Sequence, residues 1–247
     1  MLLPLLFACL FQGILSAANL PPPIKLCKND NSLSQCVLKQ SSAVIKTLVK
    51  GDPKFGIPVL DPMYIPKIEQ TEGGTKSISL NLTLEKINLY GISKAEIIKP
   101  EIDTSKKFLK LIVHVPQLKL ISDYNLSGKF LVVPVTGKGK STILVDDVMV
   151  TYIYRFKLAK KKGADYVTSV PPADLTYTTK KITFNFENLF NGDKTLGDAT
   201  NKMINENWEE FNKQLGKGVG LGIGQVFNLV LDKVAGSVPF SELFVKS

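Results

Sequence analysis

Residues 77–186 constrain the fold of this chain most, because apolar and polar residues alternate there in segment after segment. Alternation with a period of two is typical of β-strands that bury one face. The clearest run has an apolar residue at every second position: Val148, Val150, Tyr152, Tyr154, Phe156 and Leu158. So long an apolar face needs a cover, and the helically spaced apolar residues of about 198–235 could provide one.

The long alternating segments predict a strongly curved antiparallel sheet. The phase of the alternation changes after Leu84, since Ile87 and Leu89 fall on the opposite parity, and this predicts a bulge near Glu85. Further strands are expected at residues 108–115, 118–122, 124–133, 143–158, 174–179 and 182–186.

Two elements are expected before the sheet. Asn31 or Ser32 can cap a first helix, whose apolar residues keep a helical period up to Gly51. In residues 56–68, three prolines forbid a helix and predict an extended strap. Large apolar side chains accompany these prolines, so the strap is expected to be ordered.

Five glycines interrupt the apolar pattern of the C-terminal segment: Gly216, Gly218, Gly220, Gly222 and Gly224. Each costs a helix about 1 kcal/mol relative to alanine, so a kink or break is expected there unless a close neighbour compensates. Two interpretations remain open at this point. The glycines make room for a ligand or for close backbone packing, or they are a tolerated irregularity.

The first 18 residues have the features of a secretory signal peptide. They carry no charged side chain, are apolar through Leu15, and end in the small residues Ser16, Ala17 and Ala18. We therefore expect a secreted, extracellular protein whose mature part, residues 19–247, forms one domain. No later apolar stretch reaches the roughly 20 residues that a transmembrane helix requires.

Cysteine usage agrees with secretion. Without the leader, Cys27 and Cys36 are the remaining cysteines, and a close pair in an oxidising compartment predicts one disulfide. The alternative is two free buried cysteines. No metal site is expected, because His114 is the single histidine and no second cysteine pair exists.

The positive charge could suggest nucleic acid or an anionic membrane surface as a partner, but its distribution favours a solvated surface. The net charge is +9, but the lysines are scattered, and the densest run (Lys160, Lys161 and Lys162) precedes Gly163 where a hairpin should turn. Two glycosylation sequons begin at Asn81 and Asn125, each at a polar, outward position of its strand. We therefore expect both asparagines to carry glycans.

Motifs that would indicate an enzyme or a cofactor are weak. Gly139-Lys140-Ser141 looks like the end of a phosphate-binding loop, but position 134, where such a loop needs a glycine, is a proline. We expect these three residues to form a basic hairpin turn. The C-terminal glycines do not have dinucleotide-binding spacing, and no G-x-S-x-G sequence occurs. His114 lies in an alternating strand, where a satisfied or exposed imidazole is expected. The sequence therefore predicts no catalytic residues and no cofactor.

Several blocks resemble the takeout proteins and the haemolymph juvenile-hormone-binding proteins of insects. They are the spaced cysteines 27 and 36, the strap at 56–68, the segment 188–193 (NLFNGD) leading to 205–208 (NENW), and 239–244 (PFSELF). The likeness covers nearly the whole mature chain. It implies an α+β fold in which a strongly curved antiparallel sheet wraps a long C-terminal helix, the super-roll of the tubular lipid-binding (TULIP-like) proteins. It also implies a disulfide between the two cysteines and an apolar tunnel for a lipophilic ligand.

The resemblance implies a carrier of juvenile hormone, another terpenoid or a lipid, with roles in hormone transport, feeding or circadian output. An apolar tunnel needs few polar contacts, because removing ligand surface from water stabilises the complex. We expect the lining to include inward aromatic residues, with a tyrosine hydroxyl as polar anchor: Tyr152, Tyr154, Phe156, Phe184, Phe186, Phe211 and Phe227. For each residue the alternative is plain core packing.

Two other functions remain open. The positive charge would suit a protein that binds lipid surfaces or microbial envelopes, and such binding would be sensitive to salt. A secreted signalling protein with a filled core would instead bind a cell receptor and take up no ligand.

Overall fold

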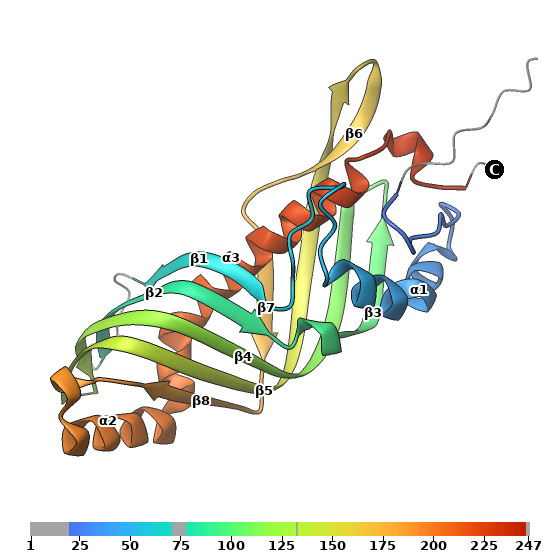
Figure 1. The fold of residues 1–247 in the computed structure, drawn as a ribbon. Helices are drawn as coiled ribbons and strands as arrows, with labels where there is room; N and C mark the ends of the chain where they lie inside the picture. Colours follow the sequence, from blue (N-terminus) through green and yellow to red (C-terminus); the bar gives the residue numbers. More distant parts are fainter. Residues whose placement is uncertain (1–19, 71–77, 132, 246–247) are drawn as a thin grey trace, which may run out of the picture.

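The computed structural model describes residues 20–70, 78–131 and 133–245, and the predicted leader lies outside them. Within these residues, one eight-stranded antiparallel sheet curves around a long C-terminal helix without closing (Figure 1). The fold class expected from the sequence is confirmed. The elements are α1 (Leu33–Leu48), β1 (Met63–Gln70), β2 (Ile78–Tyr90), β3 (Glu96–Asp103), β4 (Phe108–Phe130), β5 (Val133–Lys161), β6 (Ala164–Ser169), β7 (Asp174–Thr178), β8 (Lys181–Phe186), α2 (Lys194–Glu206) and α3 (Trp208–Ala235).

The centre of the sheet is a hairpin of two very long strands, β4 and β5, paired from Phe108 opposite Arg155 to Phe130 opposite Val133. The sequence predicted three separate strands over residues 108–133, and this was wrong. One apparent break falls at Ser122, a polar residue on the inward face. Its hydroxyl lies 2.7 Å from that of Ser141, and this buried pair satisfies both groups without ending either strand.

The predicted turn at Gly139-Lys140-Ser141 is also wrong, since all three residues lie inside β5. Glycine is needed there because atoms of other segments approach the strand too closely to leave room for a side chain, and not because the chain turns. A Cβ atom on Gly139 would lie 2.6 Å from the carbonyl oxygen of Glu187, and one on Gly137 would lie 2.6 Å from the Tyr124 hydroxyl.

Other local predictions are confirmed. The register of β2 against β4 shifts between Glu85 and Asn88, where the bulge was expected. The run of lysines ends β5 at a hairpin, with Gly163 at φ 81°, and this β5–β6 arm projects beyond the rest of the sheet (Figure 1). Strands β3 and β6 were not predicted. The strap contains turns and then becomes β1.

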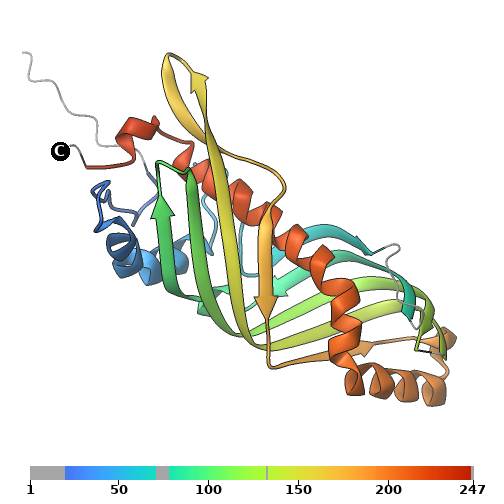
Figure 2. The same cartoon turned by 180° about the vertical axis from the view of Figure 1, so that it is seen from behind.

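Helix α3 runs unbroken through the five glycines and crosses the concave side of the sheet, beside β7 (Figure 2). The break that the sequence predicted lies instead at Asn207, between α2 and α3. The glycines form two rows. Gly216, Gly220 and Gly224 face β7, while Gly218 and Gly222 face β1. Of the interpretations left open, close backbone packing against these two strands accounts for the glycines.

Side-chain amides of α2 pair with the outer edge of β8. Asn201 accepts from the backbone N–H of Phe186 and donates to its carbonyl, both at 2.9 Å. Asn205 makes the same pair of bonds with Phe184, at 2.7 and 2.8 Å. Because an unpaired strand edge can recruit other chains, these amides protect the last strand of the sheet.

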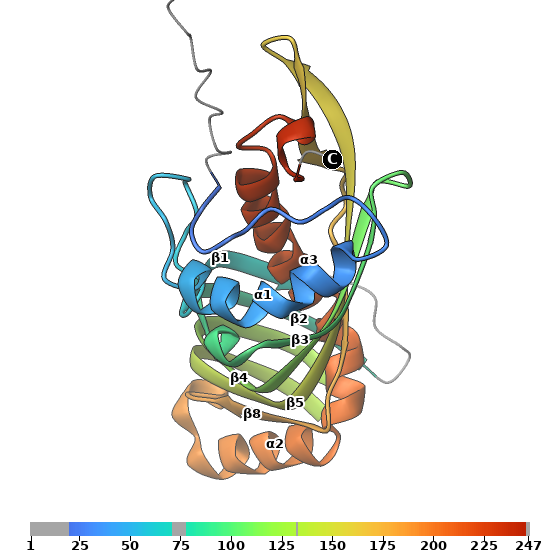
Figure 3. The ribbon, with the colours of Figure 1, turned by 90° about the vertical axis from the view of Figure 1, so that its right-hand side faces the viewer.

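The two ends of the described chain meet beside α1, which lies across the end of the sheet near β3 (Figure 3). Cys27 and Cys36 form the expected disulfide, with Cα atoms 6.0 Å apart. The backbone N–H of Val245 donates to the carbonyl of Cys27 at 2.9 Å. The disulfide therefore fastens α1 to the segment that also holds the C-terminus.

Candidate ligand cavity

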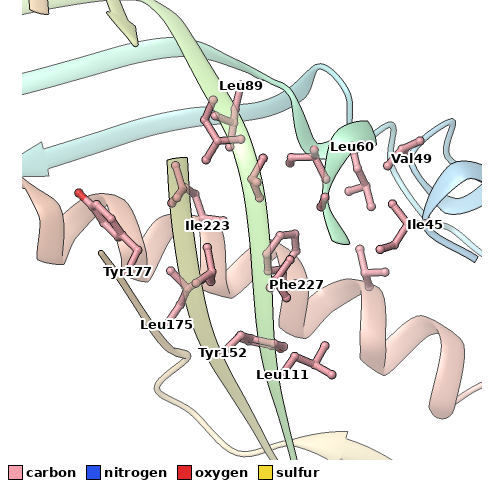
Figure 4. A pocket seen from close by; sticks show the side chains of 18 of the residues that line it. Ile45, Val49, Leu60, Leu89, Leu111, Tyr152, Leu175, Tyr177, Ile223 and Phe227 are labelled. Atoms are coloured by element: carbon pink, nitrogen blue, oxygen red, sulfur yellow. The ribbon is translucent and has the colours of Figure 1, made fainter. Parts of the chain in front are cut away.

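A cavity of about 250 Å³ lies between α3, α1 and the concave face of the sheet (Figure 4). On α3 its wall is the face that carries Val219, Ile223, Phe227 and Leu231, a stretch of roughly 18 Å at the helical rise of 1.5 Å per residue. On the opposite side, α1 contributes Ile45 and its neighbours. The cavity is therefore elongated along α3.

The interior is solid at the other end of the molecule, towards α2. Phe130, Phe184, Phe186 and Phe211 are each at most 3% exposed and pack ring against ring. Their centroid distances run from 4.8 Å for Phe184 and Phe211 to 6.1 Å for Phe184 and Phe186. Aromatic side chains thus fill one half of the space under α3 and leave the other half hollow.

The structure places two of the seven expected lining residues in the cavity wall. They are Tyr152 on β5 and Phe227 on α3, whose rings meet edge to face at 5.7 Å. Three others, Phe184, Phe186 and Phe211, belong to the solid aromatic cluster.

The remaining two expected residues lie beyond the cavity, near the C-terminal end of α3. Tyr154 donates a hydrogen bond to Asp232 at 2.5 Å. Phe156 packs against Phe240, with ring centroids 6.2 Å apart. Both are core residues in this structure.

Sequence reasoning missed most of the wall, which is aliphatic. Val113 faces Val150 across the β4–β5 hairpin, and Val115 faces Val148 in the same way. Such facing pairs of valines on the inward side of two strands were a usable signal, because small side chains leave space where aromatic ones fill it. None of the five α3 glycines lines the cavity.

The cavity wall carries almost no polar chemistry. Among its lining residues, only Tyr152 and Tyr177 have polar side-chain atoms. Tyr152 donates its hydroxyl proton to Oδ1 of Asn228, and Tyr177 donates to Oδ1 of Asn212, each at 2.6 Å. Tyrosine hydroxyls, the polar anchors expected from the sequence, therefore belong to wall residues, but each already donates its proton within the protein.

Burial keeps both hydroxyls neutral. It raises the pKa of Tyr177 to about 12, although the Asn212 hydrogen bond lowers it slightly. Burial, and then the nearby charge of Asp232, also raise the pKa of Tyr152 above its usual range. At physiological pH the wall is therefore uncharged.

These pKa shifts predict a loss of stability in alkali. A raised folded pKa contributes stability that is fully present below the unfolded value near pH 10 and is lost as the pH rises towards 12. We expect the wild-type free energy of unfolding to fall between pH 10 and 12 faster than that of Tyr177→Phe, by about 1 kcal/mol per pH unit. Urea denaturation across this range measures the difference, and parallel curves would contradict it.

Other candidate chemistry lies outside the cavity. His114 contacts Asp147 on the outer side of the sheet, with Nε2 2.6 Å from Oδ1. No group of three or more metal-binding side chains occurs among the described residues. In the same part of the chain, no helix combines the length and hydrophobicity needed to cross a membrane.

Comparison with known proteins decides the family. A model for the haemolymph juvenile hormone binding protein (JHBP) family matches residues 5–245. This chain belongs to that family. It is 24% identical to the circadian clock-controlled protein daywake of Drosophila melanogaster over 232 residues, which cover 92% of this chain and 88% of daywake. The Drosophila yakuba daywake is 22% identical over 249 residues, with 95% of each chain covered.

The crystal structure of Epiphyas postvittana Takeout 1 has the same fold. It superposes with a TM-score of 0.77 at 24% identity, covering 89% of this chain and 98% of Takeout 1. The JHBP family is named for the binding of juvenile hormone, a small hydrophobic molecule. The apolar cavity under α3 is the corresponding candidate site in this member of the family.

Proposed function

We propose that this protein is a carrier that encloses one small hydrophobic molecule, a terpenoid or a lipid, in the cavity under α3. The observation that carries the proposal is the cavity itself, about 250 Å³ with an apolar wall. Apolar surface of this extent is unfavourable while it faces water, at roughly 25 cal/mol per Å². An apolar occupant that covers the wall removes this cost.

The shape and chemistry of the wall support an elongated, neutral ligand. Burying apolar surface stabilises a complex by roughly 25 cal/mol per Å², so a terpenoid or fatty chain can bind tightly with few polar contacts. Juvenile hormone is a candidate because the family is named for it, and a circadian role is a candidate because daywake is described as clock-controlled. Transport of a hormone and control of feeding belong to the same proposal.

Displacement of a fluorescent apolar probe, N-phenyl-1-naphthylamine, tests the proposal. We expect saturable binding of one probe per chain and displacement by terpenoids or long-chain lipids at micromolar concentrations or below. Sedimentation with anionic vesicles at low and high salt tests the alternative, a basic lipid-surface or microbial-envelope binder. Vesicle binding without probe uptake would favour that alternative. Receptor binding without either would favour a signalling protein with a filled core.

We also propose that the protein is secreted and glycosylated on the outer face of the sheet. Asn81 and Asn125 are exposed there on neighbouring strands, with Asn81 opposite Ser127 and Thr83 opposite Asn125. Each sequon therefore has an accessible asparagine side chain, as a glycan requires.

Expression in insect cells tests secretion and glycosylation together. We expect the protein in the medium, with an intact mass that falls after N-glycosidase treatment. Asn81→Gln and Asn125→Gln should each remove one glycan, and the double variant should have the bare mass. Retention in the cells, or a bare wild-type mass, would contradict this prediction.

A further inference from the structure

The polar groups of the cavity wall are few enough to be counted one by one. Tyr152 on β5 and Tyr177 on β7 supply the only side-chain polar atoms among its lining residues. Every other side chain of the described wall is aliphatic or, at Phe227, aromatic. Any hydrogen bond from the wall's side chains to an enclosed ligand therefore involves one of two phenol groups.

Both phenol hydroxyls already donate their hydrogen bond to another part of the protein. A tyrosine hydroxyl has a single proton, and here it goes to Oδ1 of Asn228 from Tyr152 and to Oδ1 of Asn212 from Tyr177, each at 2.6 Å. Asn228 and Asn212 both lie on α3 outside the cavity wall. The two hydroxyls keep lone pairs that can accept a hydrogen bond, but they offer the cavity no proton.

The neighbouring helix holds one of these hydroxyls in place. At Gly216, a Cβ atom would lie 2.8 Å from the Tyr177 hydroxyl oxygen and 3.2 Å from Oδ1 of Asn212. The absence of a side chain there lets the phenol reach the amide. Gly216 thus leaves the space in which the Tyr177 hydroxyl can donate its proton to Asn212.

A ligand oxygen that only accepts hydrogen bonds is disfavoured by such a wall. A carbonyl, ester or epoxide oxygen loses its bonds to water on entering the cavity and finds no side-chain donor there, which leaves its desolvation uncompensated. A hydrocarbon chain has no such bonds to lose. A ligand hydroxyl is intermediate, because it can donate to a tyrosine lone pair.

We infer that the part of the ligand enclosed by this cavity is mainly hydrocarbon, and that the bonds from Tyr152 and Tyr177 to Asn228 and Asn212 disfavour ligands that place a carbonyl, ester or epoxide oxygen inside it. The inference rests on the proposed carrier function and narrows its ligand class. A polar head group, where the ligand has one, lies outside the enclosed part.

Undecane and 6-undecanone test the inference. They have the same chain length, and the central carbonyl of the ketone lies inside the cavity whichever end enters first. Displacement of N-phenyl-1-naphthylamine gives the ratio of their affinities for each protein. The free energy of removing each ligand from water does not depend on the protein variant. A change in the affinity ratio from one variant to another therefore measures only the change in the contacts that the cavity wall makes with the ligand.

The decisive variant is Asn228→Leu, which removes the acceptor and frees the Tyr152 proton for the ligand. We expect it to raise the affinity for 6-undecanone relative to undecane about tenfold, the usual value of one buried hydrogen bond. Adding Tyr152→Phe to this variant is the matched control. The double variant has no hydroxyl at that position, so its ratio should return to the wild-type value.

Each outcome has one meaning. A ratio that Asn228→Leu leaves unchanged in a folded protein, or a gain that survives Tyr152→Phe, overturns the inference while the carrier function stands. Failure of the wild-type protein to bind the probe and both ligands overturns the carrier function itself. Thermal melting checks the fold, and Asn212→Leu with and without Tyr177→Phe repeats the test at the second pair should the first variant not fold.

Discussion

Replacing Val113 and Ile223 together by phenylalanine should abolish ligand binding without unfolding the protein. Val113 on β4 and Ile223 on α3 both line the cavity, so the two larger rings occupy the space that the ligand needs. We expect the affinity for N-phenyl-1-naphthylamine to fall at least a hundredfold. The melting temperature should hold or rise, because the added rings cover apolar surface of the cavity wall.

Leu229→Phe is the matched control for this experiment. It makes a comparable change on α3, but the Leu229 side chain is 44% exposed and lies outside the cavity wall. We expect its probe affinity to equal that of the wild type. A filled-cavity variant that is folded and still binds the probe normally would show that the hydrophobic ligand binds somewhere else.

Two alanine substitutions in α3 should have opposite effects on stability. At Gly220, a Cβ atom would lie 2.8 Å from the Leu175 carbonyl oxygen, which β7 cannot easily move. We expect Gly220→Ala to lower the free energy of unfolding by about 1–3 kcal/mol, in spite of the better helix propensity of alanine. At Gly218 the nearest atom would be Oε1 of Gln70 at 3.5 Å, an ordinary contact, so Gly218→Ala should raise stability by up to about 1 kcal/mol.

Chemical denaturation of the two variants measures this contrast directly. Both carry the same substitution two residues apart on one helix, so helix propensity cancels in the comparison. A difference of about 1–4 kcal/mol between them is expected. Equal stabilisation by both would mean that the glycines are a tolerated irregularity rather than the means by which α3 packs between β1 and β7.

Much of the fold follows from the sequence, because a half-buried strand must alternate and a covering helix must present an apolar face. The change of phase after Leu84 located the β2 bulge correctly. Errors arose where an inward position carries a small or polar residue. Ser122 and Gly139 have the residue types of strand ends. Each lies inside a strand because of a distant contact, Ser122 with the hydroxyl of Ser141 and Gly139 with the backbone of Glu187, and local patterns do not reveal such contacts.

The cavity was harder to predict than the fold. The sequence argument chose the largest inward side chains as the lining, yet large rings fill space, and three of the seven pack together in the aromatic cluster around Phe211. A void forms where facing inward positions are small, as at Val113 and Val150. Ile45 could not be placed there at all, because the packing of α1 over the cavity is a tertiary contact with no local signature.

Native mass spectrometry of the protein purified after expression in insect cells tests the central claim most directly. The account predicts that each chain carries or takes up one small apolar molecule, which organic extraction releases for identification. The variant with phenylalanine at both Val113 and Ile223 should carry none. A wild-type protein that stays empty after exposure to terpenoids and lipids, or a filled variant that binds as much as the wild type, would contradict a carrier built around this cavity.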